Sequence, residues 1–391
     1  MNADLSIGRT VAPVPTSVRP VAGFCVLLAV AATLATGQLF GYLAFLPQLK
    51  ERFGDEAGLG MPLFAGGYAL GMIVLGSLAG RLGARQVLVA SLALGGLLSI
   101  VTACAPDISL LLGLRFAEGL VLGGFPPAAF VASVQRVPKE KILFANSAMA
   151  FGLLGSAGVA GLASHGLAST VGWRTGVVVY GALLLGAAGI GFLQSGIAAG
   201  QRGPVHPYRL VAIELTGSEV AFSAGCGALT MATFVTANGL AQQSPHSIAS
   251  LVVVLTIVLT LLALAKHIVR RPADLRRTLG LVLTLSGAVV VLFADSHVLA
   301  ALSLATIGAT LTVPASIQQV VVGARRAVPV AVAVFTCSLF VGGALAGLVV
   351  TGLVDFEIST LALLLVFGLA CAEIAALIRR SRTERATRGT I

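Results

Sequence analysis

"GLRFAEGLVLGGFPPAAFV", residues Gly113–Val131, is a stretch of 19 residues that is apolar almost throughout. It contains two charged residues, Arg115 and Glu118, which are three positions apart. A helix needs about 20 consecutive apolar residues to cross a bilayer. The stretch therefore predicts a membrane-spanning helix, and the two charges inside it are the first candidates for a functional site.

The whole chain shares the character of this stretch. Of its 391 residues, 57% are hydrophobic and only 10% are charged, and the mean hydropathy is +1.00. Soluble domains carry about 25% charged residues, so this chain cannot cover a surface that faces water. The lipid core admits helices or closed barrels, and the apolar runs are too long and continuous for alternating barrel strands. The composition therefore predicts an all-α membrane protein.

Apolar runs of membrane-spanning length occur twelve times. We place them at residues 21–46, 61–80, 87–105, 108–133, 142–165, 174–195, 210–237, 247–268, 278–294, 297–322, 327–351 and 358–378. A polar segment, Gln194–Arg209, separates the first six runs from the last six. We therefore expect a cytoplasmic segment at 1–20, a six-helix bundle at 21–195, a cytoplasmic linker at 196–209, a second bundle at 210–378 and a basic tail at 379–391.

The two groups of six runs repeat each other in sequence. "FGLLGSAGVAGLA" at Phe151–Ala163 resembles "CSLFVGGALAGLV" at Cys337–Val349, about 186 residues later. "GGFPPAAF" at Gly123–Phe130 and "LTVPASIQ" at Leu311–Gln318 have a similar separation. Many secondary transporters are built from such repeats and bind their substrate between them near the bilayer midplane. The chain is thus expected to form two pseudo-symmetric bundles.

The net charge of +10 reflects the orientation of the chain in the membrane and does not indicate a nucleic-acid partner. If the N-terminus is cytoplasmic, 21 of the 25 Lys and Arg residues fall in cytoplasmic segments and 3 fall in outer segments. This asymmetry follows the positive-inside rule. We therefore expect both termini in the cytoplasm and, for a bacterial source, a location in the inner (plasma) membrane.

The segment after the second run carries a motif. "GSLAGRLGARQ" at Gly76–Gln86 resembles the loop pattern Gly-x-Leu-Ala-Asp-Arg-x-Gly-Arg-Arg of the major facilitator superfamily. The residues that match include Gly76, Arg81, Gly83 and Arg85, whereas Gly80 stands where that family has Asp. The resemblance implies the twelve-helix major facilitator fold and a conformational latch at these four residues.

A narrower resemblance lies in the opening stretch. Arg115, Glu118 and Gly119 resemble the Arg followed by Gln-Gly in span four of the drug/proton antiporter and arabinose-efflux-type branch. The following Pro126–Pro127 pair is also similar to that branch. This resemblance implies proton-coupled export of a small organic compound or drug by alternating access.

The site residues follow from charge and depth. Arg115 and Glu118 share one helix face, and Glu118 is expected roughly 15 Å into the bilayer, which makes it a candidate proton carrier tuned by Arg115. Glu219, roughly 14 Å into the run 210–237, is a second candidate. In the family's architecture spans one, four, seven and ten line the cavity, which gives as candidate substrate contacts Gln38, Tyr42, Arg115, Glu219, Gln318 and Gln319.

Other functions are left open. Uptake of a small anionic nutrient, proton-coupled or facilitated, keeps the same fold and makes Arg115 a clamp for the substrate. A membrane sensor or enzyme is a third alternative, disfavoured because the loops between the runs are short. We expect no metal site, cofactor or ATP-binding loop, so an ion gradient supplies the energy. The expected partners are a small substrate, protons and membrane lipid, with the protein acting as a monomer.

Overall fold

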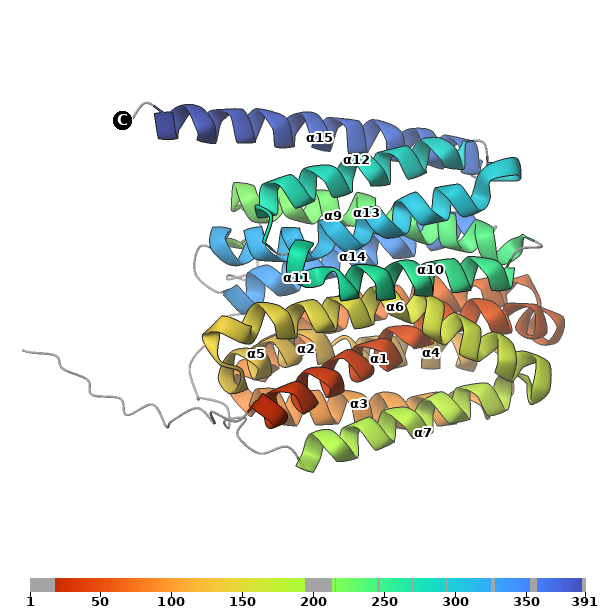
Figure 1. The fold of residues 1–391 in the computed structure, drawn as a ribbon. Helices are drawn as coiled ribbons and strands as arrows, with labels where there is room; N and C mark the ends of the chain where they lie inside the picture. Colours follow the sequence, from red (N-terminus) through yellow and green to blue (C-terminus); the bar gives the residue numbers. More distant parts are fainter. Residues whose placement is uncertain are drawn as a thin grey trace, which may run out of the picture.

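A computed structural model of the chain describes residues 18–193, 213–214, 216–244, 247–268, 270–292, 294–324, 328–351 and 357–388 (Figure 1). The regular elements of these residues are helices. The first half contains α1 (Val18–Phe53), the short helix η1 (Asp55–Leu59), α2 (Gly60–Leu82), α3 (Ala84–Thr102), α4 (Ile108–Leu122), α5 (Phe125–Arg136), α6 (Lys139–Thr170) and α7 (Gly172–Leu193). The second half contains α9 (Ser218–Gln243), α10 (Ser247–Ala263), α11 (Ala265–Ile268), α12 (Ala273–Val291), α13 (Ala294–Gly323), α14 (Val328–Val350) and α15 (Ile358–Arg388).

Each of the twelve predicted runs contains a helix, so the prediction of an all-α membrane fold is confirmed. Ten helical stretches in the described residues are long and apolar enough to cross a membrane. The other two runs correspond to α10, an apolar helix of 17 residues, and α12, whose first turn carries charged residues. Large apolar side chains such as Leu193, Val322 and Phe367 are 71–80% exposed on the outside of the bundle, as lipid contact requires.

One predicted run is broken in the middle. The run 108–133 forms two helices, because α4 ends at Leu122 and α5 begins at Phe125. Pro126 and Pro127 occupy the first turn of α5, where a residue without a backbone N–H costs no hydrogen bond. Gly123 lies against the backbone of Tyr68 on α2, where a Cβ atom would overlap the Tyr68 carbonyl. The break therefore coincides with a close contact between α4 and α2.

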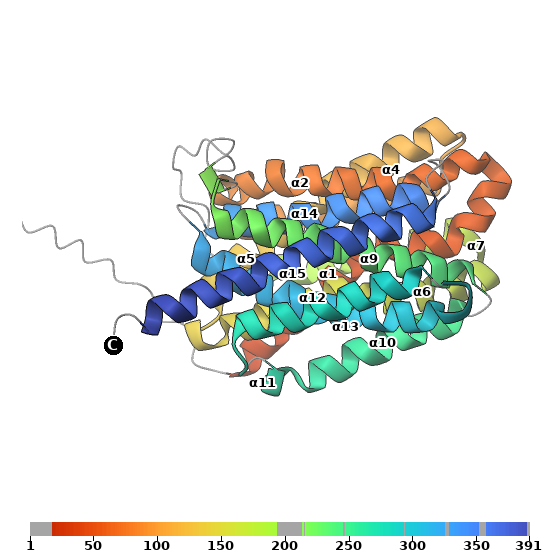
Figure 2. The same cartoon turned by 90° about the horizontal axis from the view of Figure 1, so that it is seen from above.

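The helices pair in the same way in both halves. In the first half α1 packs on α6, α2 on α4 and α3 on α7; at the equivalent positions of the second half α9 packs on α14, α10 on α13 and α12 on α15 (Figures 1 and 2). The halves meet where α2 packs on α14 and where α6 packs on α10. The repeated sequences Phe151–Ala163 and Cys337–Val349 lie in α6 and α14, so each repeat supplies one helix of this interface.

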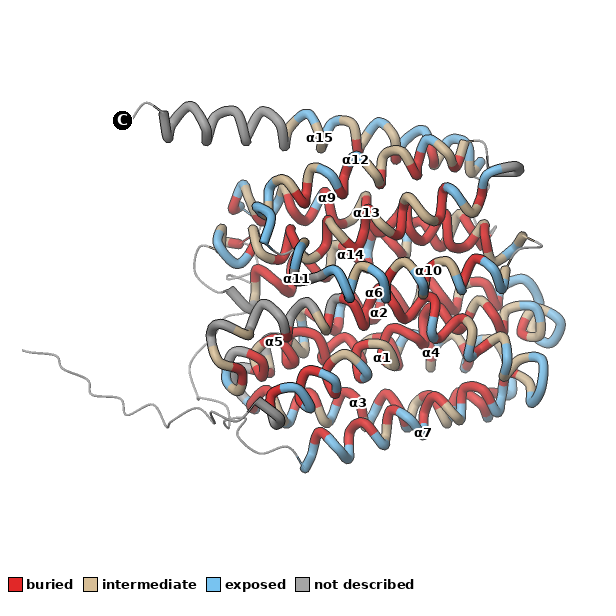
Figure 3. Tube along the Cα trace, in the orientation of Figure 1, coloured by how far each residue is buried: buried red, intermediate tan, exposed pale blue. Residues whose placement is uncertain are grey.

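Small residues bring the two halves close together. A Cβ atom on Gly158 of α6 would lie only 2.9 Å from the backbone nitrogen of Leu255 on α10. The glycines of α6 thus act in close helix packing. Buried positions are concentrated between the helices and exposed positions on the outer surface, as Figure 3 shows.

Candidate functional site

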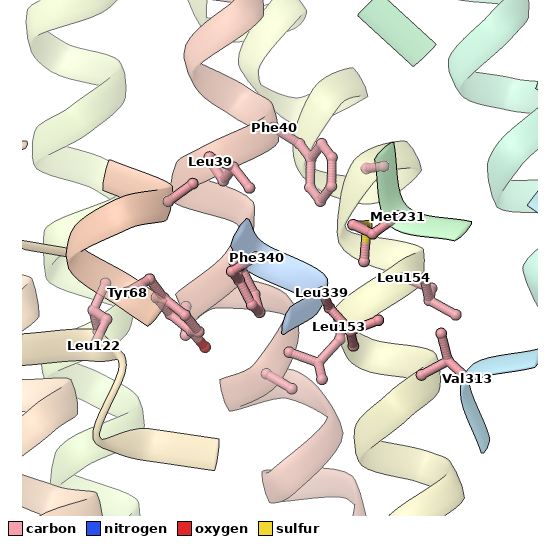
Figure 4. Packing of buried hydrophobic residues seen from close by; sticks show 14 of the residues in the cluster. Leu39, Phe40, Tyr68, Leu122, Leu153, Leu154, Met231, Val313, Leu339 and Phe340 are labelled. Carbon is pink, nitrogen blue, oxygen red and sulfur yellow. The ribbon is translucent and has the colours of Figure 1, made fainter. Parts of the chain in front are cut away.

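A small apolar cavity lies between the two halves. Its volume is about 20 Å³, and it is lined by Thr36, Leu39, Phe40, Leu153, Leu154, Met231, Val235, Val313, Leu339, Phe340 and Gly343 (Figure 4). The hydroxyl of Thr36, the one polar side chain of this lining, donates to the Ala32 carbonyl at 2.7 Å. A volume of this size holds about one water molecule. This space, called the central cavity here, is therefore too small for an organic substrate in the described conformation.

Aromatic side chains cross the interface beside this cavity. Phe40 of α1 meets Phe234 of α9 edge to face, with ring centroids 5.8 Å apart. Tyr68 of α2 stacks on Phe340 of α14 with ring centroids 4.2 Å apart (Figure 4). Phe64 stacks on Tyr68 with ring centroids 5.8 Å apart. A row of three rings thus runs from the cavity wall at Phe340 into the first half.

The row of rings ends at Arg115. Its guanidinium carbon lies 4.5 Å from the ring centroid of Phe64 and 4.8 Å from that of Tyr42, which is cation–π geometry. Arg115 Nη1 donates to Glu118 Oε2 at 2.6 Å, and Nη2 donates to the Gln38 carbonyl at 2.7 Å. The Arg115 and Glu118 side chains are 2% and 1% exposed. The sequence-predicted pair is therefore formed, and it is buried inside the first half.

Gln38 and Tyr42 surround this pair and do not line the central cavity. The Gln38 amide donates to Ser99 at 2.9 Å, and the Tyr42 hydroxyl donates to the Ala57 carbonyl at 2.6 Å. Both residues border a separate void of about 10 Å³ next to Arg115. They position the Arg115 guanidinium in this conformation.

The candidates from the second half lie at one end of the bundle. This end, at which α2 ends and α9 begins, is called the basic end here; α11 marks it in Figure 1. Because α9 begins at Ser218, Glu219 lies in the first turn of the helix and not at the expected depth. Glu219 forms an ion pair with Arg277 of α12.

Two glutamines extend the same cluster. Gln318 accepts a hydrogen bond from Arg276, and the Gln319 amide donates to Asp274 at 2.8 Å. Asp274 also lies 3.4 Å from Arg277. Three residues that the sequence predicts to contact the substrate therefore connect α9, α12 and α13 at the basic end, away from the central cavity. They are Glu219, Gln318 and Gln319.

The predicted latch residues lie at the turn between α2 and α3. Gly83 has a φ of +102°, a backbone conformation that favours glycine. A Cβ atom on Gly76 would lie 2.9 Å from Pro127 of α5. Arg85 donates to the carbonyl of Phe192 at the end of α7. The side chain of Arg81 lies outside the described residues.

Sequence reasoning missed most of the cavity wall, which is formed by leucine, valine, methionine and phenylalanine. An apolar residue in an apolar helix carries no signal of facing a cavity, whereas the arrangement of helices reveals it. No group of three or more residues with metal-binding side chains occurs in the described residues.

Comparisons with known proteins show which family this chain matches. Residues 28–347 match the Major Facilitator Superfamily. Over 149 residues the chain is 35% identical to the 4-hydroxybenzoate transporter PcaK of Pseudomonas putida, and over 144 residues it is 30% identical to the probable sulfoacetate transporter SauU of Cupriavidus necator. These matches cover 37% and 36% of this chain and 33% of each relative, so the chain spans about a third of the length of the curated relatives it matches.

Solved structures show the same fold. The chain is similar to the E. coli fucose:proton symporter FucP, with a TM-score of 0.68 and 16% identity over 92% of this chain and 99% of that one. It is similar to the nucleoside transporter NupG with a TM-score of 0.61 and 14% identity over 91% and 99% of the two chains. The narrower resemblance to drug/proton antiporters is not confirmed by these matches. Because the family match spans residues 28–347, most of the chain, this integral membrane protein belongs to the Major Facilitator Superfamily and is a transporter, not an enzyme.

Proposed function

We propose that this transporter takes up a small organic acid anion together with a proton, by alternating access. The observation that carries the proposal is the Arg115–Glu118 pair, with an N–O distance of 2.6 Å and side chains 2% and 1% exposed. Ionisable residues are costly inside a membrane helix and mark proton or substrate pathways in transporters. In this proposal Glu118 carries the proton and Arg115 supplies the charge that the substrate balances.

The charge of the pair links the two ligands. Ionised Glu118 balances Arg115, whereas protonated Glu118 leaves the guanidinium without a counter-charge in a low-dielectric interior. A substrate anion in the central cavity restores part of the balance through space, since the apolar rings of Phe64, Tyr68 and Phe340 separate Arg115 from the cavity wall and screen charges less than water would. Binding of the proton and binding of the anion therefore favour each other, which is the reciprocal linkage that symport requires.

Two observations support an organic anion as the substrate. 4-Hydroxybenzoate and sulfoacetate, for which the matched relatives are named, are both organic anions at neutral pH. The lining of the central cavity is aliphatic and aromatic, which suits a substrate with a hydrocarbon body. None of the relatives reported above is named as an exporter, so uptake replaces the export that the motif resemblance implies.

The remaining predicted residues receive structural roles in this proposal. From the positive-inside rule we infer that the basic end faces the cytoplasm, that both chain termini are cytoplasmic and that the membrane is the bacterial inner membrane. Glu219, Gln318 and Gln319 hold the cytoplasmic ends of their helices together. The turn with Gly76, Arg81, Gly83 and Arg85 acts as a conformational latch between α2 and α3, close to α5 and α7.

The test uses purified protein in liposomes with labelled 4-hydroxybenzoate and an imposed inward proton gradient. We expect gradient-driven accumulation by the unmodified protein. Glu118→Gln mimics the permanently protonated state, so it should lose accumulation yet still exchange labelled for unlabelled substrate across the membrane. Glu56→Gln, which changes an exposed carboxylate of the same half, should behave like the unmodified protein.

Two results would contradict the proposal. Normal accumulation by Glu118→Gln would show that Glu118 does not carry the coupled proton. Substrate movement against the proton flow would establish export and restore the antiport that the motif resemblance implies.

A further inference from the structure

One face of α9 continues the wall of the central cavity as a polar stripe. Met231 and Val235 line the cavity, and Asn238 and Gln242 follow them at positions i+7 and i+11. Residues at this spacing lie on one side of a helix. The two amides therefore extend the cavity-facing side of α9 toward the end of the bundle opposite the basic end.

The contact between Phe40 and Phe234 fixes where this stripe lies. It joins α1 to α9 across the interface, and Asn238 is one turn beyond Phe234, about 6 Å along the axis at 1.5 Å per residue. Asn238 thus lies between the halves, at a depth close to that of the Phe40–Phe234 contact. Separation of the halves at the end opposite the basic end would expose this stripe to an entering substrate.

The side-chain amides of Asn238, which is fully buried, and of Gln242, which is partly buried near the end of α9, are without hydrogen-bond partners in the described residues. Asn238 is 0% exposed, and neither its Nδ2 nor its Oδ1 has a hydrogen-bond partner in the described part of the chain. The same holds for the buried Nε2 and Oε1 atoms of Gln242. Two neighbouring polar side chains on α9 are satisfied, since Thr236 donates to Ala232 and Gln243 donates to Val350. Two turns before Asn238, the buried hydroxyl of Thr230 is a further group without a partner in the described residues.

Four unpaired atoms at two positions one helical turn apart are costly to a folded protein. A buried donor or acceptor without a partner loses its interaction with water and gains none in return. Apolar side chains of the same size would avoid this loss. The amides are therefore better explained by a ligand that pairs with them than by the packing of the closed state.

The chemistry of an amide defines that ligand. Each amide offers a donating NH₂ group and an accepting oxygen. A carboxylate only accepts hydrogen bonds, so it would leave both amide oxygens unpaired. A hydroxyl group donates one hydrogen bond and accepts others, so it can pair with an oxygen of one amide and the nitrogen of the other.

We propose that Asn238 and Gln242 form a binding site for a hydroxyl group of the transported substrate. This inference rests on the proposed function and adds that the organic acid carries a hydroxyl away from its acid group. Arg115 in the first half compensates the charge of the anion, and the amides of α9 in the second half form hydrogen bonds with the hydroxyl group. A substrate that bridges the halves in this way would favour their closure around it.

The first test needs no ligand. Asn238→Leu keeps the approximate size of the side chain and removes the unpaired atoms. We expect its apparent unfolding temperature in detergent to rise or stay equal. Thr236→Val is the matched control on the opposite face of α9, where it removes a hydroxyl that is already bonded. A clear fall with Asn238→Leu, larger than with Thr236→Val, would mean that the amide has a structural partner and would overturn the proposal.

The second test measures recognition of the hydroxyl. Uptake into liposomes is compared for 4-hydroxybenzoate and benzoate, and for 3-hydroxybutyrate and butyrate. The unmodified protein should prefer the hydroxylated member of at least one pair. Asn238→Leu and Gln242→Met should each reduce that preference about tenfold, mainly by slowing uptake of the hydroxylated acid.

The outcomes separate the two proposals. Uptake of both members of a pair with equal rates, or an unchanged preference in both variants, overturns the hydroxyl site and leaves organic-anion uptake standing. Absence of uptake for all four acids overturns the proposed function for this class of substrate. The unfolding temperatures of Asn238→Leu and Thr236→Val then still show whether the Asn238 amide has a structural partner.

Discussion

Arg115 and Glu118 stabilise the protein only as a pair. Removing one partner leaves a full charge buried, which costs about 3–5 kcal/mol, whereas replacing both by apolar groups is often neutral. We therefore expect Arg115→Met to lower the apparent unfolding temperature strongly, and Arg115→Met/Glu118→Leu to recover most of the loss without restoring transport. Thermal unfolding in detergent, together with the uptake assay, measures both effects.

The exposed pair between Lys50 and Asp55 provides the control. Its N–O distance is 3.1 Å, and the Asp55 side chain is 92% exposed. Surface pairs contribute little, so Lys50→Met should leave the unfolding temperature almost unchanged. Equal effects of Arg115→Met and Lys50→Met would show that the buried pair is not a stability determinant.

Glu219 differs from Glu118 in its surroundings, and the two should respond differently to neutralisation. Glu219 is 26% exposed and pairs with Arg277 at the basic end. Glu219→Gln should therefore keep proton-driven accumulation while lowering the unfolding temperature by a few degrees, because Arg277 loses one of its two carboxylate partners. Loss of accumulation with retained exchange would instead assign a coupling proton to Glu219.

The spacing of residues in the sequence predicts the pairing of Glu118 with Arg115, but it does not predict the position of Glu219. Arg115 and Glu118 are three residues apart within one apolar run, so their pairing follows from helix geometry alone. The depth of Glu219 depends on where its helix begins, and the expected run 210–237 starts eight residues before the helix start at Ser218. Its partner Arg277 is 58 residues away in the sequence, a distance that no local pattern bridges.

At the scale of elements, glycines determine how closely α4 approaches α2. A Cβ atom on Gly119 would overlap the backbone of Phe64, whereas one on Gly113 of the same helix would meet nothing within 4 Å. Gly119→Ala should therefore lower the unfolding temperature and reduce transport, since Phe64 stacks on Arg115. Gly113→Ala should be neutral or slightly stabilising, because alanine favours the helix.

Thermal unfolding of the two variants side by side decides this prediction. A Gly113→Ala variant as damaged as Gly119→Ala would show that helix flexibility, and not the approach of α2 to α4, requires these glycines. The sequence identifies both residues as glycines of one run, but only the neighbouring helix distinguishes them.

At the scale of the molecule, the proposed alternating access requires the halves to separate at the end opposite the basic end. There a Cβ atom on Gly347 of α14 would lie 3.8 Å from the sulfur of Met61 of α2. In a variant without the five native cysteines, a thiol cross-link between Met61→Cys and Gly347→Cys should abolish uptake, and reduction should restore it.

A cross-link within one half is the control. A Cβ atom on Gly191 of α7 would lie 3.4 Å from the Leu88 side chain of α3. Joining Leu88→Cys to Gly191→Cys should leave uptake intact, because both helices belong to the first half. Continued uptake by the cross-linked Met61/Gly347 variant would exclude separation of α2 from α14 as a step of transport.

Much of the architecture follows from the sequence, because a bilayer allows few arrangements. The twelve runs predict the helices, and the repeat of Phe151–Ala163 at Cys337–Val349 singles out α6 and α14, each of which packs against a helix of the other half. The cavity wall does not follow, since Leu39 or Val313 differs from a lipid-facing residue only in its neighbours. Asn238 and Gln242 are two amides seven and eleven residues after Met231 in the sequence. This spacing indicates a site only once the structure shows that Met231 lines the cavity.

The charged start of α12 has a consequence for how the protein is made. Asp274, Arg276 and Arg277 lie in the first turn or so of this helix, and it is not among the ten stretches apolar enough to cross a membrane on their own. Its most extensive packing is against α13, the next helix to leave the ribosome. We therefore expect α12 to wait at the translocon and to enter the lipid together with α13 as a hairpin, so that a nascent chain halted after Val291 would leave α12 outside the bilayer.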